Sequence, residues 1–308
     1  MTRRNWLLFA AMCIIWGIPY LLIRIAVRDI SPADLVFART SIAALILLPI
    51  ALRRRELQPV LRRWRPLLAF TVVEVAAPWL LLSDAETKLS SSLTGLLIAA
   101  VPLAGVLMLR VIGDHQPIQP STLVGLLMGL LGVAALVGLD VHQLNAFGLF
   151  EIALVVLGYA LGPIILSRTL SDLPSIGVIT ASLSITAVVY LPFVVLDPPK
   201  QLTGESIASV LVLASVCTAL AFVVFFALIA AIGPARAVVI TYVNPAVAML
   251  LGVIALGEKF TAGMAVGFPL ILAGSILGAR RRAVSEGSEP ALADVRDPAA
   301  AIPSNAPS

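Results

Sequence analysis

Charged side chains are scarce in this sequence of 308 residues: Asp, Glu, Lys and Arg make up 12% of it, and hydrophobic residues make up 60%. Soluble domains are usually about a quarter charged and about half apolar. With a mean hydropathy of +1.04, the chain is predicted to be an integral membrane protein whose spans fill most of its length. The net charge of +4 comes from a few loops, which indicates membrane orientation and gives no evidence for nucleic-acid binding.

Metal-ligating and catalytic residues are also few. The two histidines, His115 and His142, lie in separate loops, so the sequence predicts no metal site and no cofactor. Cys13 and Cys217 lie inside apolar runs, which favours packed thiols over a disulfide or a metal pair. Asp residues lie in loops and at helix ends, and no histidine lies in a span. Because the paired groups of a membrane-embedded enzyme are missing, the protein is not expected to be an enzyme.

Strict alternation of apolar and polar residues, the mark of membrane β-barrels, is absent, and long apolar runs indicate helices instead. A span needs roughly 20 apolar residues. The first run exceeds signal-peptide length and has no A-x-A cleavage site, so it is interpreted as an uncleaved helix. Breaks in hydropathy predict an all-α membrane protein with ten transmembrane helices, at about 6–27, 33–52, 66–83, 91–112, 120–139, 147–167, 174–196, 206–231, 235–256 and 262–280.

Positive residues collect on one side of these predicted helices. With the N-terminus inside, the outer loops hold only Arg28, Lys88, Lys200 and Lys259, with Arg24 near that edge. The inner segments hold Arg3, Arg4, Arg53, Arg54, Arg55, Arg62, Arg63, Arg65, Arg110, Arg168, Arg236, Arg280, Arg281 and Arg282. This bias predicts that both termini are cytoplasmic. Residues 281–308 are rich in Ala, Pro, Ser and acidic residues and are predicted to form a disordered cytoplasmic tail.

The two halves of the sequence match when one is shifted by about 143 residues. Five spans in each half, an odd number, require the second half to enter the membrane upside down, as in many secondary transporters. We therefore expect two inverted five-helix repeats, residues 1–140 and 141–280. The matched features are Pro32 with Pro174, Pro49 with Pro192, LIAAVP (to Pro102) with ITYVNP (to Pro245), IGDH with LGEK, and Gly125 and Gly132 with Gly267 and Gly274.

Three segments give the chain a resemblance to a known family. They are IIWGIPYLLIRIAV in the first helix, SPADLVFARTSIAALILLP in the second, and NPAVAMLLGVIALGEKFTAGMAVGFPLILAGSIL in the last two. The first half has GDHQP in place of GEK. Over residues 6 to about 280, the chain resembles the EamA-type branch of the drug/metabolite transporter superfamily. The resemblance implies two inverted halves that move small organic solutes, often outward, and it specifies the substrate poorly.

Residues shared by both halves are interpreted as scaffold. The glycines of the fifth and tenth helices let helix backbones approach closely in lipid. The acidic residue after glycine, Asp114 or Glu258, is expected to cap or turn its loop. Prolines inside helices remove a donor and free the carbonyl four residues earlier, which in lipid needs another partner. Kinks around a cavity, or kinks that serve only packing, are therefore expected at Pro78, Pro102, Pro163 and Pro245.

Residues found in only one half are the candidates for the substrate pathway. Trp16 and Tyr20 are four apart and would share a helix face, either as an aromatic wall for solutes or as an ordinary packing stripe. Thr241 and Asn244 are three apart and would face together beside a freed carbonyl. The full set of candidates is Trp16, Tyr20, Arg39, Glu74, Trp79, Tyr159, Thr241, Tyr242 and Asn244.

Glu74 is a single carboxylate inside the apolar stretch TVVEVAAPWLLL. Pro78 frees the Glu74 carbonyl, and a water drawn there would also solvate the side chain. Arg39, one helix away, either snorkels to the surface or pairs with Glu74. Intramembrane ionisable groups commonly line pathways, so Glu74 is a candidate for proton coupling or amine binding. The alternative is a structural Glu74–Arg39 pair or a protonated acid that only fixes packing.

Taken together, the sequence predicts a secondary transporter of the plasma membrane that exports small metabolites, such as amino acids or similar amphipathic solutes, by alternating access. The lipid bilayer, a small solute and protons are its expected partners. A proton-independent facilitator and a non-transporting membrane scaffold remain alternatives. A channel is disfavoured because the two unequal halves provide no ring of charges or carbonyls.

Overall fold

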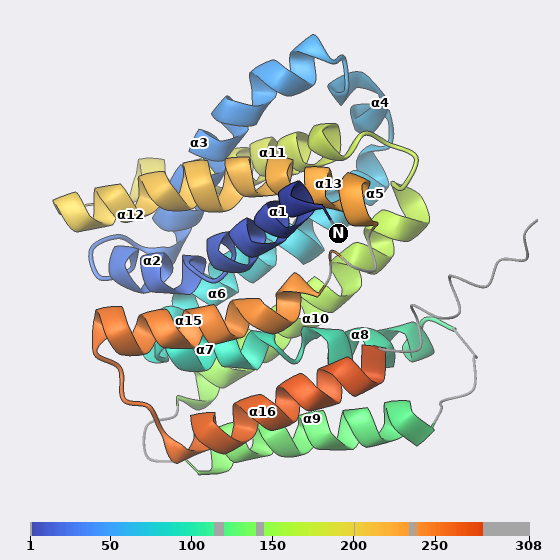
Figure 1. Cartoon of the computed structure of the whole chain (residues 1–308). Coiled ribbons are helices and arrows are strands. Elements are labelled where there is room, and N and C mark those ends of the chain that lie inside the picture. The colour runs from blue at the N-terminus through green and yellow to red at the C-terminus, as the bar shows by residue number, and fades with distance from the viewer. Residues whose placement is uncertain are drawn as a thin grey trace, which may run out of the picture.

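The computed structural model describes residues 2–113, 120–139, 145–199, 201–233, 237 and 239–279, and every regular element in these ranges is a helix (Figure 1). The all-α prediction is confirmed for this part of the chain. The predicted tail 281–308, the expected loop acid Asp114 and both histidines lie outside the described residues.

The first half of the chain contains long helices and shorter helical pieces that follow one another closely. They are α1 (Arg3–Ile15), α2 (Pro19–Ala26), α3 (Pro32–Arg53), α4 (Leu57–Arg62), α5 (Trp64–Phe70), the π-helix η1 (Thr71–Ala76), α6 (Ala77–Lys88), α7 (Ser91–Ile98), α8 (Val101–Val111) and α9 (Pro120–Gly138). The second half contains α10 (Ala146–Thr169), α11 (Ser175–Leu196), α12 (Gly204–Ala214), the π-helix η3 (Ser215–Leu220), α13 (Ala221–Ile232), α15 (Ile240–Leu256) and α16 (Ala262–Ala279).

Seven continuous or nearly continuous helices in the described ranges are long and apolar enough to cross a membrane. They coincide with seven of the ten predicted spans. The helices α7 and α8 together make an eighth, bent by 40° where Pro102 begins the second piece. The last two predicted spans correspond to the shorter apolar helices α15 and α16. The kink predicted at Pro102 is therefore present, whereas Pro163 and Pro245 lie inside helices that continue on both sides.

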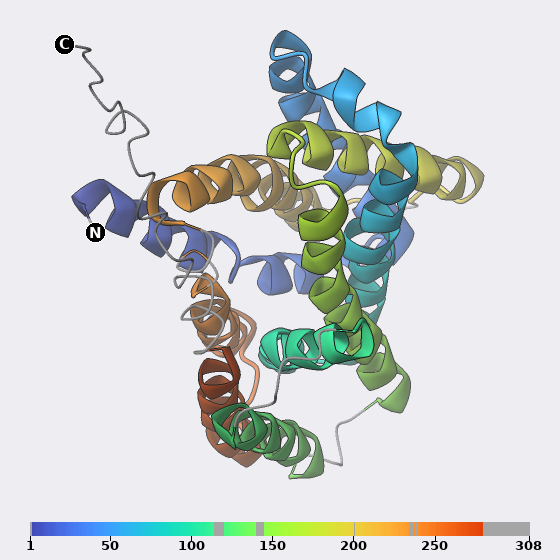
Figure 2. The same cartoon turned by 90° about the vertical axis from the view of Figure 1, so that its right-hand side faces the viewer.

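Neighbouring helices come from different halves of the chain. The closest pairs are α9 with α16, α3 with α11, α6 with α10, and α7 with α15, and α1 and α2 pack on α13 and α12. Figures 1 and 2 both show α9 beside α16 along one edge of the bundle. On α9, the outward-facing leucines are more than half exposed, for example Leu127 and Leu130 at 53% and 66%. Such an apolar face is expected where lipid covers the protein.

Glycines make the contact between α9 and α16 unusually close. A Cβ added at Gly132 would lie 2.7 Å from the Gly267 carbonyl oxygen and 2.7 Å from the Ile271 backbone nitrogen. Backbone atoms cannot move away as a flexible side chain can. The predicted scaffold role of these glycines therefore has a direct geometric cause, because any side chain would force the two helices apart.

The substitution Gly132→Ala should lower the free energy of unfolding by about 1–3 kcal/mol, because the added methyl group overpacks the α9–α16 contact. A matched control is Gly105→Ala on α8, where the new Cβ would meet nothing within 4 Å. That change should leave stability unchanged or raise it by up to about 1 kcal/mol, since alanine favours helix. Thermal unfolding of the purified variants in detergent compares them. Equal melting temperatures would show that the glycine contact is not limiting.

Candidate functional site

Arg39 lies in the interior of the bundle. Arg39 belongs to α3 and is 8% exposed. Its Nε donates a hydrogen bond of 2.9 Å to Thr218 Oγ1, and its Cζ lies 3.6 Å from the centre of the Trp79 ring. These partners come from η3 and α6, so one guanidinium joins three helices and both halves of the chain. Stacking on an aromatic face stabilises a cation that has left water. The snorkelling alternative does not describe this side chain.

Of the alternatives left open for Glu74 and Arg39, the structure does not show the ion pair. Arg39 is held by Trp79 and Thr218, and no ion pair joins it to Glu74. Glu74 instead lies against α10, where a Cβ added at Gly162 would approach the Glu74 Cβ and Cδ to 2.8 Å. The residue is half-buried, but its Oε2 atom is covered and has no hydrogen-bond partner. The acid therefore sits in the interior without a counter-charge.

The backbone around Glu74 is a π-helix, which the sequence did not predict. Within η1 the turns widen, and the Ala77 N–H at its end bonds to the Val72 carbonyl five residues earlier. The equivalent position of the second half also forms a π-helix, η3, with Cys217 in place of Glu74. Ala221 follows η3, with no proline near it. Pro78 alone is thus not the cause of the wide turn, because both halves have a π-helix and only the first half has the proline. π-turns are frequent at functional sites.

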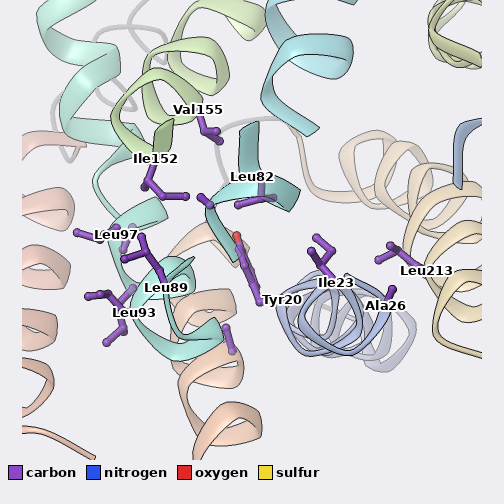
Figure 3. Close-up of a cluster of buried hydrophobic side chains, with 14 of the residues drawn as sticks. Tyr20, Ile23, Ala26, Leu82, Leu89, Leu93, Leu97, Ile152, Val155 and Leu213 are labelled. Carbon is purple, nitrogen blue, oxygen red and sulfur yellow. The ribbon is translucent and has the colours of Figure 1, made fainter. Parts of the chain in front are cut away.

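Two tyrosines flank the Arg39 cluster. Tyr20 and Tyr159 both lie close enough to Arg39 to interact with its charge, and Tyr159 also interacts with Glu74. Tyr20 is 8% exposed and extends from α2 toward Leu82 of α6 (Figure 3). Tyr159 lies one turn before Gly162 on α10. Five of the predicted pathway residues are therefore brought to one region, namely Tyr20, Arg39, Glu74, Trp79 and Tyr159.

Trp16 belongs to a different region. The first span breaks between α1, which ends at Ile15, and α2, which begins at Pro19, so Trp16 and Tyr20 do not share one helix face as predicted. The Trp16 ring instead packs on Phe222 and Phe225 of α13, at centroid distances of 6.0 and 4.6 Å. A proline at the start of the second helical piece explains the break, because it cannot donate to the preceding turn.

Residues of α15 hold that helix to its neighbours. The Tyr242 hydroxyl donates to the Ser275 carbonyl of α16 at 3.3 Å. With its amide nitrogen oriented toward them, Asn244 donates to the Ile240 carbonyl at 3.0 Å and to the Cys13 carbonyl of α1 at 3.1 Å. Thr241 lies on the same helix, between these contacts. The polar groups of Tyr242 and Asn244 thus bind backbone carbonyls of α1, α15 and α16 and not the Arg39 side chain.

Comparison with known proteins places the chain among transporters. The EamA-like transporter family matches it twice, over residues 4–138 and 146–279. The chain belongs to the EamA-like transporter family. It is a multi-pass protein of the plasma membrane, and its family consists of transporters rather than enzymes.

Several EamA-like relatives align along most of the chain. An uncharacterized transporter of Archaeoglobus fulgidus is 23% identical over 91% of this chain and 100% of that protein. Protein PecM of Dickeya dadantii is 26% identical over 87% and 90%. The uncharacterized inner membrane transporter YedA of Escherichia coli is 28% identical over 79% of each. A solved crystal structure with 19% sequence identity superposes on this chain with a TM-score of 0.65. The match covers 92% of this chain and 99% of the solved chain, which shows the same fold.

Sequence reasoning missed the partners that organise this EamA-like site. Thr218 accepts the Arg39 hydrogen bond, and the Tyr190 hydroxyl of α11 donates 3.0 Å to the Ala76 carbonyl at the end of η1. Thr71 of η1 and Ser182 of α11 are joined hydroxyl to hydroxyl at 3.0 Å. The repeat offered one signal, because Thr218 directly follows Cys217, the counterpart of Glu74. Each π-helix is therefore held by a helix of the opposite half, η3 by α3 and η1 by α11.

The substitution Thr218→Val should lower the free energy of unfolding by about 1.5–3 kcal/mol, because it removes an acceptor from a buried charged donor. Thr186→Val is the matched control: Thr186 is equally buried, and its hydroxyl bonds only to the Ser182 carbonyl one turn earlier. The control should lose well under half as much stability. Chemical or thermal unfolding of both variants measures the difference. Equal losses in the two would mean that Arg39 does not depend on Thr218.

Proposed function

We propose that this protein is a secondary transporter that moves small organic metabolites by alternating access between two inverted halves, residues 1–140 and 141–280. Ten transmembrane helices with both termini in the cytoplasm complete the proposed topology. The double family match supports it, because one family unit covers each half. The packing of α3 on α11 and of α9 on α16, and the paired π-helices, support it as well.

The observation that carries the proposal is the Arg39 cluster, which links the halves through few contacts. One hydrogen bond to Thr218 and one stacking contact with Trp79 hold the guanidinium. Glu74 lies in the same region with an unpartnered oxygen. A charge held loosely between two halves is suited to exchanging partners when the halves rock. An interior ionisable group is by default a functional candidate in a membrane protein.

The chemistry of the region favours an amino acid or a similar amphipathic solute. Arg39 can receive a carboxylate, Glu74 can receive an amine, and the rings of Tyr20, Trp79 and Tyr159 offer apolar surface with polar edges. Export is proposed from the family resemblance, and the relatives named above carry no solute in their names. Solute binding would give Arg39 a stronger partner than Thr218 and would so favour one arrangement of the halves.

Glu74 is proposed to couple this transport to protons. The protein is reconstituted into proteoliposomes, and the flux of amino acids is measured with and without a pH gradient. The flux through the parent protein should respond to the gradient. In Glu74→Gln the gradient-driven flux should fall about tenfold, which corresponds to a free-energy difference of about 1.4 kcal/mol. Asp197→Asn, the same chemical change at an exposed acid beyond α11, should behave as the parent. Flux that ignores the gradient in both proteins, with Gln transporting normally, would make the protein a proton-independent facilitator.

A transporter must also bind its solute, and a membrane scaffold need not. Purified protein is heated in the presence of a metabolite panel, and the true solute should raise the melting temperature. At a concentration one hundred times its Kd, a ligand adds about 2.7 kcal/mol of stability. Trp79→Ala, which removes the surface under Arg39, should abolish the response, whereas Trp64→Ala on the exposed face of α5 should preserve it. A panel without any stabilising solute, together with absent flux, would favour the scaffold.

A further inference from the structure

A second group of buried oxygens without partners lies away from Glu74, where α6 ends and α7 begins. Within the part of the chain that the structure describes, six buried side-chain oxygens lack a hydrogen-bond partner. Four of them belong to this short segment: both carboxylate oxygens of Glu86 and the hydroxyls of Ser91 and Thr94. All three residues are 0% exposed. Buried polar groups without partners are strongly unfavourable in protein interiors, so this group of oxygens requires a physical explanation.

Two charged side chains of opposite sign act on Glu86. Arg24 of α2 reaches it and donates from Nη1 to the Glu86 backbone carbonyl, not to the carboxylate. Glu258, beyond the end of α15, is the other charged group that acts on Glu86. The two oxygens of Glu258 accept the Ser91 and Ser92 backbone N–H groups at 2.8 and 2.9 Å, which caps α7. Arg24 and Glu258, one charge of each sign, are thus the charged groups that act on Glu86, and neither binds its carboxylate.

The other acids near this end are already paired. On α6 itself, Lys88 contacts Asp84 and also binds Glu151 of α10 at 3.0 Å, which closes a network separate from Glu86. Tyr20 of α2 interacts electrostatically with Glu86, and Figure 3 shows its side chain directed toward Leu82, one helical turn before Glu86. Glu86 therefore stands alone among its neighbours, as an acid with neither a donor nor a cation on its carboxylate.

We propose that Glu86 is a proton-binding site distinct from Glu74, holding its proton as a neutral carboxylic acid at the α6–α7 junction that also carries the unpartnered hydroxyls of Ser91 and Thr94. A proton from water adds to one Glu86 oxygen and neutralises the carboxylate. The resulting O–H needs an acceptor, and the two hydroxyls bring acceptor oxygens to the same end of the bundle. This binding is an equilibrium property of the folded protein and does not rest on the proposed transport.

Solvent reaches the end of α2, the helix that carries Arg24. A surface hollow at the end of α2 is lined by Ile25, Arg28, Asp29, Thr203, Gly204 and Glu205. The hydrogen bond from the Thr203 hydroxyl lowers the pKa of the exposed Asp29 carboxyl, so this acid stays ionised at neutral pH. Arg24 precedes Ile25 in α2 and contacts Glu86.

Infrared spectroscopy of protein in lipid nanodiscs detects the carbonyl band of protonated carboxyl groups and tests the proposal directly. Glu74→Gln serves as the background, because it removes the other unpartnered intramembrane acid. At neutral pH, this variant should retain a protonated-carboxyl band, and the double variant Glu74→Gln, Glu86→Gln should show a clearly smaller one. The band should also decrease as the pH is raised, which would show that the proton exchanges with solvent.

Three results would overturn the proposal. One is the same band in the single and double variants, and another is its absence from the single variant. The third is a band present in choline chloride that disappears in sodium chloride, which would make Glu86 a ligand of a metal cation. If Glu86→Gln does not fold, Glu86→Asp in the same background replaces it and should shift the band without removing it. Because no solute or flux is involved, failure of this test leaves the proposed transport intact, and the converse also holds.

Discussion

Polar groups in the interior of this protein must find partners within the protein, because the bilayer around it lacks water. Arg39 shows the constraint most clearly, since its charge is accommodated by one aromatic face and one hydroxyl. Among the residues that the structure describes, the unpartnered oxygens of Glu74 and Glu86 are the exceptions that lie on acids within the spans. In a bilayer the free energy of an isolated charge is several kcal/mol or more above that in water. Such exceptions are therefore where we propose that a solute or a proton binds.

The duplicated scaffold explains why those exceptions are found where they are. Each half places a π-helix at the same point of its third span, and the second helix of the opposite half packs on it, α3 on η3 and α11 on η1. A π-turn leaves backbone groups without their usual helical partners, so side chains such as Tyr190 supply them. On this shared frame, Glu74 and Arg39 are departures of one half only. The same fold can thus keep its packing while its interior chemistry varies.

Much of this architecture was predictable from patterns with a simple physical origin. Long apolar runs gave the helices, and seven of the ten predicted spans coincide with helices of spanning length. The break at Pro102 and the small residues along α9 and α16 followed from the chemistry of proline and glycine. The two π-helices did not, because a single extra residue in a turn leaves no mark on hydropathy. The break before Pro19 was missed although it has the same cause as the break at Pro102. Trp16 was misplaced for this reason, since its predicted face assumed an unbroken helix.

The sequence by itself determined that the chain crosses the membrane, that it consists of two related halves, and that Glu74 and Arg39 are unusual residues within them. Composition and periodicity carry this information because they reflect the energy of each residue in lipid. Only the tertiary structure decided which groups meet: Arg39 with Thr218 and Trp79, Glu74 with Gly162, and Glu86 near Arg24 and Glu258. These contacts join residues as far apart as 179 positions. They depend on the rotation and depth of each helix, which local sequence leaves free.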